Sequence, residues 1–246
     1  MPDTRPHRSR PAGAATPLIE ATAGAVSAVV FGMGSGLRRA RVFHPTGVAF
    51  QATFVVSGGA HGAPLLDVPA RHPAVVRLSR GVGLPERFPD ILGLAVRLVD
   101  AHGPGRHQDL LVATSGSAPL LRHLLVPARS FDHGRMSALL PYAIGQRRVI
   151  FGARPLRAGG GPTTRLADLA GELGSGRLRF VIEAAEATGP WAEIGVLEVG
   201  APLSSSDAES LRFNPANAGG GVEPVGALQA VRRLAYRGSQ ATRPTD

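Results

Sequence analysis

Two positions in this sequence carry side chains that could act on one ligand together. His44, in RVFHPTGVAF (residues 41–50), lies between an apolar run and a Pro-Thr-Gly turn, and its imidazole could serve as a general acid and base. Tyr236 follows Arg232 by four residues. On a helix this spacing places the guanidinium beside the phenol, lowers the phenol's pKa, and favours a phenolate that can ligate ferric iron. The residues alone are also consistent with a loop histidine and with a surface tyrosine beside a chance arginine.

Other common catalytic patterns are missing from the sequence. The chain contains no cysteine, which excludes disulfides, thiolate catalysis and zinc–thiolate sites. Its eight histidines form no i, i+4 pair with a carboxylate between them, and TSGSAP (114–119) is not a Gly-x-Ser-x-Gly elbow. The glycine clusters at 159–162 and 218–221 lack the spacing of a nucleotide-binding loop, so we expect both to be loops.

Alternating and β-branched runs separated by Gly/Pro-rich turns dominate the chain. They predict an α+β protein built on an antiparallel sheet closed into a barrel. Weaker helical patterns lie at 17–34, 117–141 and 222–235. We expect a disordered, basic, Pro-rich tail at 1–16 and one barrel domain at 17–246. The predicted strands are GVAFQATFVV, AVVRLS, LGLAVRLV, DLLVAT, RRVIFGARP, RLRFVIEAA and AEIGVLEV.

The distribution of the arginines along the chain argues against a nucleic-acid partner. Its net charge of +9 comes from 27 arginines and no lysine, and the arginines are scattered with little aromatic interleaving. This pattern is typical of a GC-rich genome rather than of a binding surface. The apolar stretch at 17–34 is interrupted by Glu20 and is too short to span a membrane. We therefore expect a cytoplasmic protein with a small-molecule substrate, and a homo-oligomer is compatible with the sequence.

The order of several motifs resembles that of the haem catalase family. RVFHPTG (41–47) is similar to the distal histidine motif, with Pro45-Thr46 in place of the usual Ala-Lys. PAVVRLSRGVG (73–83) looks like the strand that supplies a haem-facing arginine and a serine, and PDILGLAVRL (89–98) matches the strand after it. DLLVATS (109–115) falls where the distal asparagine strand is expected.

The end of the chain carries the proximal part of this resemblance. GPWAEIGVLEVG (189–200) is followed by FNPAN, a glycine turn, GVEP and then R-x-x-x-Y, as in the segment that carries the haem ligand of catalases. The resemblance implies an eight-stranded antiparallel β-barrel around a haem pocket, with short flanking helices. The chain is about half the length of a catalase, so it resembles a minimal, barrel-only, catalase-related peroxidase.

The resemblance also implies how haem b, an iron cofactor, is bound. Tyr236 would ligate the iron, and Arg232 would favour its phenolate form. The candidates for binding the haem propionates are Arg41, Arg77 and Arg243, because of their motif positions and their charge. The alternative for all three is a solvated arginine in an arginine-rich chain.

The implied catalytic residues are His44, Ser79 and Thr114. His44 would transfer the peroxide proton, and Ser79 would fix the tautomer of its ring. Ala113 stands where the family has its distal asparagine, and Thr114 is the nearest polar neighbour. The next segment, GSAPLLRHLL, lacks the phenylalanines that usually stack over the haem.

These departures affect the expected reaction more than the expected cofactor. We expect a haem peroxidase-like oxidoreductase that acts on hydrogen peroxide or organic hydroperoxides and has weak catalase activity. Two alternatives stay open. One is a catalase-fold binding module that lacks haem or does not turn over, and the other is a haem enzyme that rearranges lipid hydroperoxides.

Overall fold

The computed structural model describes residues 46–157, 166 and 178–226 of the chain. Its helices are short: α2 (Pro64–Asp67), the 3₁₀ helix η1 (Leu121–His123) and α4 (Ser205–Ser210). None of the helices in these ranges is long and apolar enough to cross a membrane. The strands are β1 (Thr46–Val56), β2 (Ala70–Arg80), β3 (Leu92–Leu98), β4 (Gln108–Ser115), β5 (Arg135–Ser137), β6 (Tyr142–Ile144), β7 (Arg147–Arg157), β8 (Leu178–Ala185), β9 (Ala192–Pro202) and β10 (Val222–Pro224).

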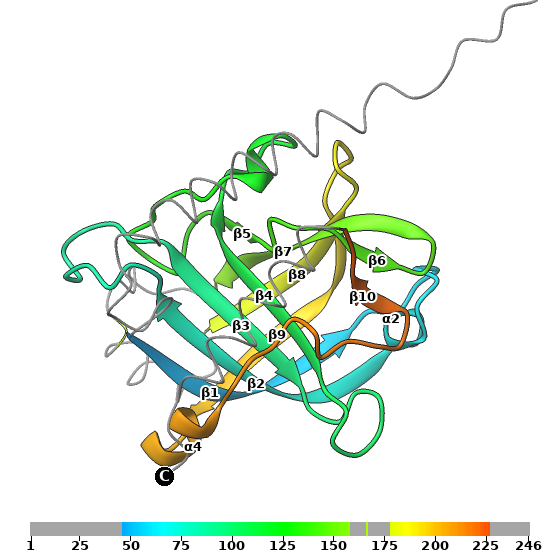
Figure 1. Ribbon diagram of the computed structural model, residues 1–246, viewed down its shortest axis with the longest axis horizontal. Helices are drawn as coiled ribbons and strands as arrows, with labels where there is room; N and C mark the ends of the chain where they lie inside the picture. The colour runs from blue at the N-terminus through cyan, green and yellow to red at the C-terminus, as the bar shows by residue number, and fades with distance from the viewer. Residues whose placement is uncertain (1–45, 158–165, 167–177, 227–246) are drawn as a thin grey trace, which may run out of the picture.

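Eight of these strands close into an antiparallel β-barrel (Figure 1). Around the barrel the order is β8-β9-β1-β2-β3-β4-β5-β7, and pairing of β7 with β8 completes the circle. Strands β6 and β10 extend the sheet from β7. The closed antiparallel barrel predicted from the sequence is therefore confirmed, and each of the seven predicted runs lies in a strand to within one residue over the described ranges.

The interior of the barrel is filled by the apolar residues of the alternating strands. Phe50 and Phe54 of β1, Leu78 of β2, Phe151 of β7 and Phe180 of β8 all belong to one buried cluster. An eight-stranded barrel leaves an interior about wide enough for its own side chains, and these large residues occupy it. Residues of the opposite parity lie on the outer face of each strand.

The predicted helix at 117–141 is wrong. This segment contains one 3₁₀ turn at η1 and otherwise runs as a loop into β5. Prolines at 119, 127 and 141 interrupt any longer helix, because proline removes a backbone donor and clashes with the preceding turn. The predicted helix at 222–235 begins instead as the strand β10, and residues beyond 226 lie outside the described ranges, as do 17–34 and the tail at 1–16.

A buried carboxylate ties a late segment of the chain to the barrel. Asp109 of β4 is fully buried and accepts two hydrogen bonds from Arg97 of β3, at 2.8 Å from Nε and 2.7 Å from Nη2. It also accepts 2.7 Å and 2.9 Å hydrogen bonds from Asn214 N and Asn217 Nδ2. The segment 212–217, which precedes β10, is thereby held across the strands (Figure 1). We call these four residues the Asp109 clamp.

We predict that Asp109→Ala lowers the free energy of unfolding by about 3–5 kcal/mol. The substitution leaves the Arg97 guanidinium, whose side chain is only 15% exposed, without its counter-ion. The measurement is denaturant unfolding of both variants and the wild type. Glu198→Ala is the matched control, because Glu198 binds Arg71 at 2.7 Å with side chains 41% and 62% exposed, and its loss should cost within about 1 kcal/mol. Equal losses in the two variants would contradict the role of the clamp.

Candidate functional site

The structure describes three of the eight residues that the sequence nominates. Arg77 and Ser79 lie two residues apart on the outer face of β2, and Thr114 lies in β4. The other five nominated residues lie outside the described ranges: Arg41, His44, Arg232, Tyr236 and Arg243.

Short side chains form a flat area around Ser79 on the outer face of the barrel. The register aligns Gly47 of β1, Ser79 of β2, Gly93 of β3 and Ala113 of β4 in one row. In the adjacent row, Ala49 and Ala95 flank Arg77. We call this area the small-residue bed; its members are Gly47, Ala49, Ser79, Gly93, Ala95 and Ala113.

Arg77 extends its guanidinium over one end of the small-residue bed. A Cβ atom placed on Gly47 would lie 2.9 Å from the Arg77 Cζ atom and 2.7 Å from the Leu78 carbonyl oxygen. Position 47 therefore has to be glycine for Arg77 to lie in this place. Arg77 is half-buried, and Ser79 is buried with its hydroxyl 3.4 Å from the Gly93 carbonyl oxygen, to which it donates. A cation and a hydroxyl thus lie beside one row of short side chains.

Thr114 is not brought together with Ser79 and Arg77. It has the parity of the interior residues of β4, pairs with Met136, and is 3% exposed. Its Oγ1 accepts a hydrogen bond of 3.1 Å from the Leu92 backbone nitrogen. Ala113, by contrast, lies on the outer face in the row of Ser79, so the position facing the bed carries a methyl group and no polar atom.

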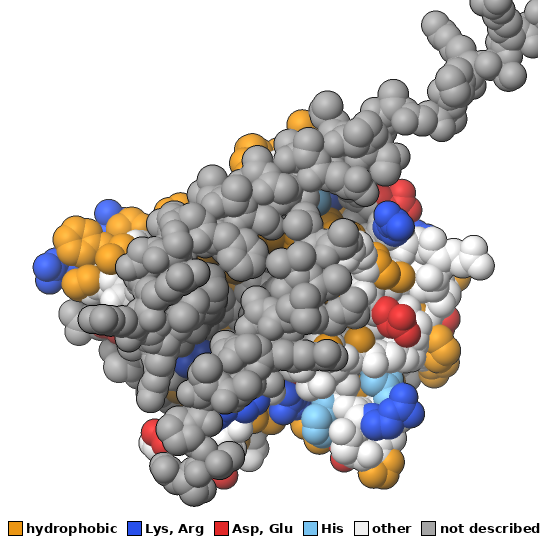
Figure 2. All heavy atoms as spheres, in the orientation of Figure 1, with side chains coloured by type: hydrophobic (Ala, Val, Ile, Leu, Met, Phe, Trp, Pro, Cys, Tyr) orange, Lys and Arg blue, Asp and Glu red, His pale blue; other side chains and the backbone are white. Residues whose placement is uncertain are grey.

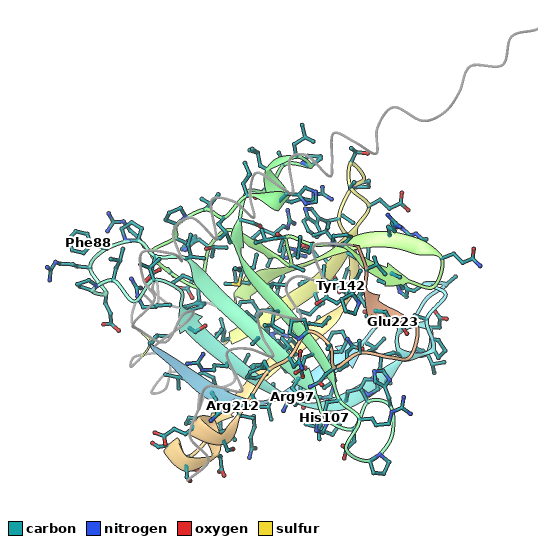
Figure 3. The ribbon with its side chains drawn as sticks, in the orientation of Figure 1. Phe88, Arg97, His107, Tyr142, Arg212 and Glu223 are labelled. Atoms are coloured by element: carbon teal, nitrogen blue, oxygen red, sulfur yellow. The ribbon has the colours of Figure 1, made fainter. Side chains whose placement is uncertain are left out.

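The Asp109 clamp lies on the same outer face, four residues along β4 from Ala113, which is about 13 Å. Figure 3 shows Arg97 and Arg212 close to each other at this place, where Arg97 donates to the Arg212 carbonyl oxygen. The Arg97 guanidinium also stacks over the Phe213 ring at 5.3 Å. The sequence pattern pointed to the segment FNPAN, but it did not predict Asp109 and Arg97 as the residues that bind this segment. The available signal was a pair of opposite charges in two adjacent predicted strands.

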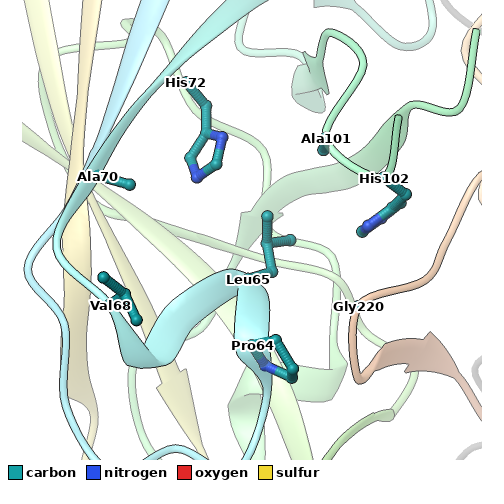
Figure 4. A pocket seen from close by; sticks show the side chains of 8 residues that line it. All are labelled: Pro64, Leu65, Val68, Ala70, His72, Ala101, His102 and Gly220. Carbon is teal, nitrogen blue, oxygen red and sulfur yellow. The ribbon is translucent and has the colours of Figure 1, made fainter. Parts of the chain in front are cut away.

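A separate cleft of about 220 Å³ lies near the opposite end of β2 and contains two histidines (Figure 4). His102 bonds Gln108 Oε1 at 3.0 Å through Nε2, and the same oxygen accepts from Gly219 N, so His102 carries its proton on Nε2. Burial, and then the charge of a protonated His102, lower the pKa of His72. In the described ranges no three His, Cys, Asp or Glu side chains gather as a metal site. The cleft is lined by Pro64, Leu65, Val68, Ala70, His72, Ala101, His102 and Gly220.

No protein-family model and no curated protein matches this sequence.

The lowered pKa of His72 predicts a pH-dependent stability. In the folded protein His72 stays neutral below the pH near 6.5 at which an unfolded histidine takes up its proton. Protonation then favours the unfolded chain, so the free energy of unfolding should fall as the pH is lowered from about 7 towards 5. Denaturant unfolding at several pH values should show a shallower fall in His72→Gln. His133→Gln, which removes an exposed imidazole, is the control. An unchanged slope in His72→Gln would refute the assignment.

Proposed function

We propose that this protein is a haem-dependent, peroxidase-like oxidoreductase that acts on hydrogen peroxide or organic hydroperoxides and has weak catalase activity. The small-residue bed with Arg77 at its edge is the observation that supports this most. A planar macrocycle needs a flat surface without large side chains, and its carboxylates need a cation such as a guanidinium. Because side chains fill the barrel interior, we place the cofactor on the outer face.

The residues that would bind haem b come from both ends of the chain. Haem b, when bound, supplies a redox-active iron at which the O–O bond of a peroxide is cleaved. In our proposal Tyr236 ligates that iron, and Arg232 keeps the phenol ionised. Arg77 binds a propionate, with Arg41 and Arg243 as further candidates. The clamped segment 212–217 precedes the stretch that contains Arg232 and Tyr236 in the sequence.

His44 is the proposed proton carrier. It precedes Gly47 by three residues, which associates it with the end of β1 that borders the row of Ser79. Its imidazole takes the proton from the peroxide and returns it to the departing oxygen, which then leaves as an alcohol or water. Ser79, buried in the same row, is the candidate for orienting the ring. Two electrons from an external donor and two further protons complete the reduction, in which the second peroxide oxygen becomes water.

Ala113 supports a peroxidase reaction over a catalase reaction. To oxidise a second hydrogen peroxide, the site has to orient that molecule with a second polar group beside His44. In the row of Ser79 this position is a methyl group, and the neighbouring Thr114 faces the interior. Loss of one positioned donor typically costs on the order of a hundredfold in rate. Transfer of the first proton by His44 does not need this donor.

The first prediction from this proposal concerns the cofactor. Protein expressed with a haem supply should show a Soret band. Tyr236→Phe should remove or shift this band. Arg232→Leu should alter how the band changes at alkaline pH, because the arginine favours the ionised phenol. Ala113→Leu should prevent haem uptake, because an isobutyl group would stand on the small-residue bed. Ala143→Leu is the matched control, since Ala143 is half-buried on β6. A colourless wild-type protein would contradict the proposal and favour a haem-free binding module.

The second prediction concerns the reaction of the haem-loaded protein. Cumene hydroperoxide should oxidise a one-electron dye readily, whereas hydrogen peroxide should yield little oxygen. Ala113→Ser should raise oxygen evolution, by up to about a hundredfold, because it adds a hydroxyl donor beside Ser79 without placing a large side chain on the small-residue bed. His44→Ala should lose both activities. Vigorous oxygen evolution by the wild type, or full activity of His44→Ala, would refute these roles. Conversion of a lipid hydroperoxide without dye oxidation would identify a rearranging enzyme instead.

A further inference from the structure

Exposed apolar side chains of the described ranges are concentrated on two connections. Eight large apolar residues are exposed there, and seven of them lie between β2 and β3 or between β4 and β5. The eighth, Val68, follows α2. The seven are Val82, Leu84, Phe88, Leu120, Leu121, Leu124 and Val126.

Both connections lie at the same end of the barrel. β2 and β4 run towards this end, and their antiparallel neighbours β3 and β5 start from it. Asp90 and Ala128 join the connections through two backbone hydrogen bonds of 2.9 Å and 2.8 Å, and Arg129 donates to the Arg87 carbonyl oxygen at 3.1 Å. Val68 lies just before β2, about 35 Å away along this eleven-residue strand. We call the end that carries the seven residues the loop face.

The exposure of these side chains is set by an ordered backbone. The Asp90 carboxylate is buried and accepts hydrogen bonds of 2.9–3.0 Å from the backbone nitrogens of 82, 83 and 84. Its charge is balanced by Arg80, whose Nε lies 3.6 Å away. The connection between β2 and β3 is thus fixed around a polar centre. Val82 and Leu84 are left on its outer side at 42% and 43% exposure.

Cations lie beside the apolar residues of the loop face. The Arg87 guanidinium stacks over the Phe88 ring at 4.8 Å, and Arg129 is exposed next to it. Neither arginine forms an ion pair with a described residue, and Glu86 is the acidic neighbour on the same connection. Figure 2 shows orange hydrophobic and blue arginine side chains together at the left edge, where Figure 3 labels Phe88.

We propose that the loop face docks onto an anionic lipid surface. Aliphatic and aromatic side chains at loop tips can enter the membrane–water interface, and each arginine near an anionic headgroup layer strengthens binding by roughly fivefold. A second copy of the chain is the less suitable occupant. In a symmetric contact Arg87 and Arg129 would approach the same cations of another molecule of net charge +9.

The test is flotation of the full-length protein with vesicles of phosphatidylcholine, with and without phosphatidylglycerol. The wild type should float with the phosphatidylglycerol vesicles. Phe88→Ser combined with Leu120→Ser should weaken this binding by about tenfold or more, because both side chains lose their apolar contact with lipid. Arg87→Gln combined with Arg129→Gln should reduce the preference for the anionic vesicles. Val68→Ser is the matched control and should bind as the wild type does.

Three outcomes would overturn the inference. They are a wild type that does not float, a Phe88→Ser/Leu120→Ser variant that floats as well as the wild type, and an equal loss in Val68→Ser. The second would show that the net positive charge alone causes binding. A dimer that this double variant dissociates, without flotation of the wild type, would assign the loop face to a second copy. Thermal unfolding shows whether each variant is folded, and the assay is independent of haem and of any reaction.

Discussion

The buried carboxylate of Asp109 is the interaction on which the arrangement of this molecule depends. A carboxylate without access to water is stable only when cations and donors satisfy its oxygens. Arg97 supplies two of these hydrogen bonds from the neighbouring strand, and Asn214 and Asn217 supply the others from 105 and 108 residues further along the chain. The segment 212–217 therefore helps to stabilise a buried charge of the barrel.

The closed barrel separates packing from binding. Large residues such as Phe54 and Phe180 fill the inside beyond the cleft at His72, so the proposed cofactor is placed on the outer face. There the rows of Ser79 and Arg77 combine short side chains with one hydroxyl and one cation. These rows lie near the ends of β2 and β4, from which the connections of the loop face begin. The two proposals together favour substrates that dissolve in a lipid surface, such as the hydroperoxides of acyl chains.

Much of the fold could be predicted because the strands that form the barrel alternate strongly. The three strands that sequence reasoning missed, β5, β6 and β10, have three residues each, too few for a periodic pattern. The predicted helix at 117–141 was wrong for a related reason. Leu120, Leu121 and Leu124 have helical spacing, but in the structure all three are exposed and only Leu121 lies in the 3₁₀ turn η1. These leucines belong to the exposed loop face. A local sequence pattern does not distinguish exposed apolar residues on a loop from the apolar side of a buried helix.

The sequence by itself determined the barrel strands and the chemistry available on β2, because period-two alternation and side-chain type are local properties. Tertiary structure alone decided which of two adjacent residues in β4 faces the bed. Ala113 does and Thr114 does not, because the register with β3 sets the parity of every side chain. It also decided that Asp109 meets Asn217. Such partners, distant in sequence, are selected by barrel closure and by the cost of leaving a buried charge unsatisfied, and neither is visible in a local stretch of residues.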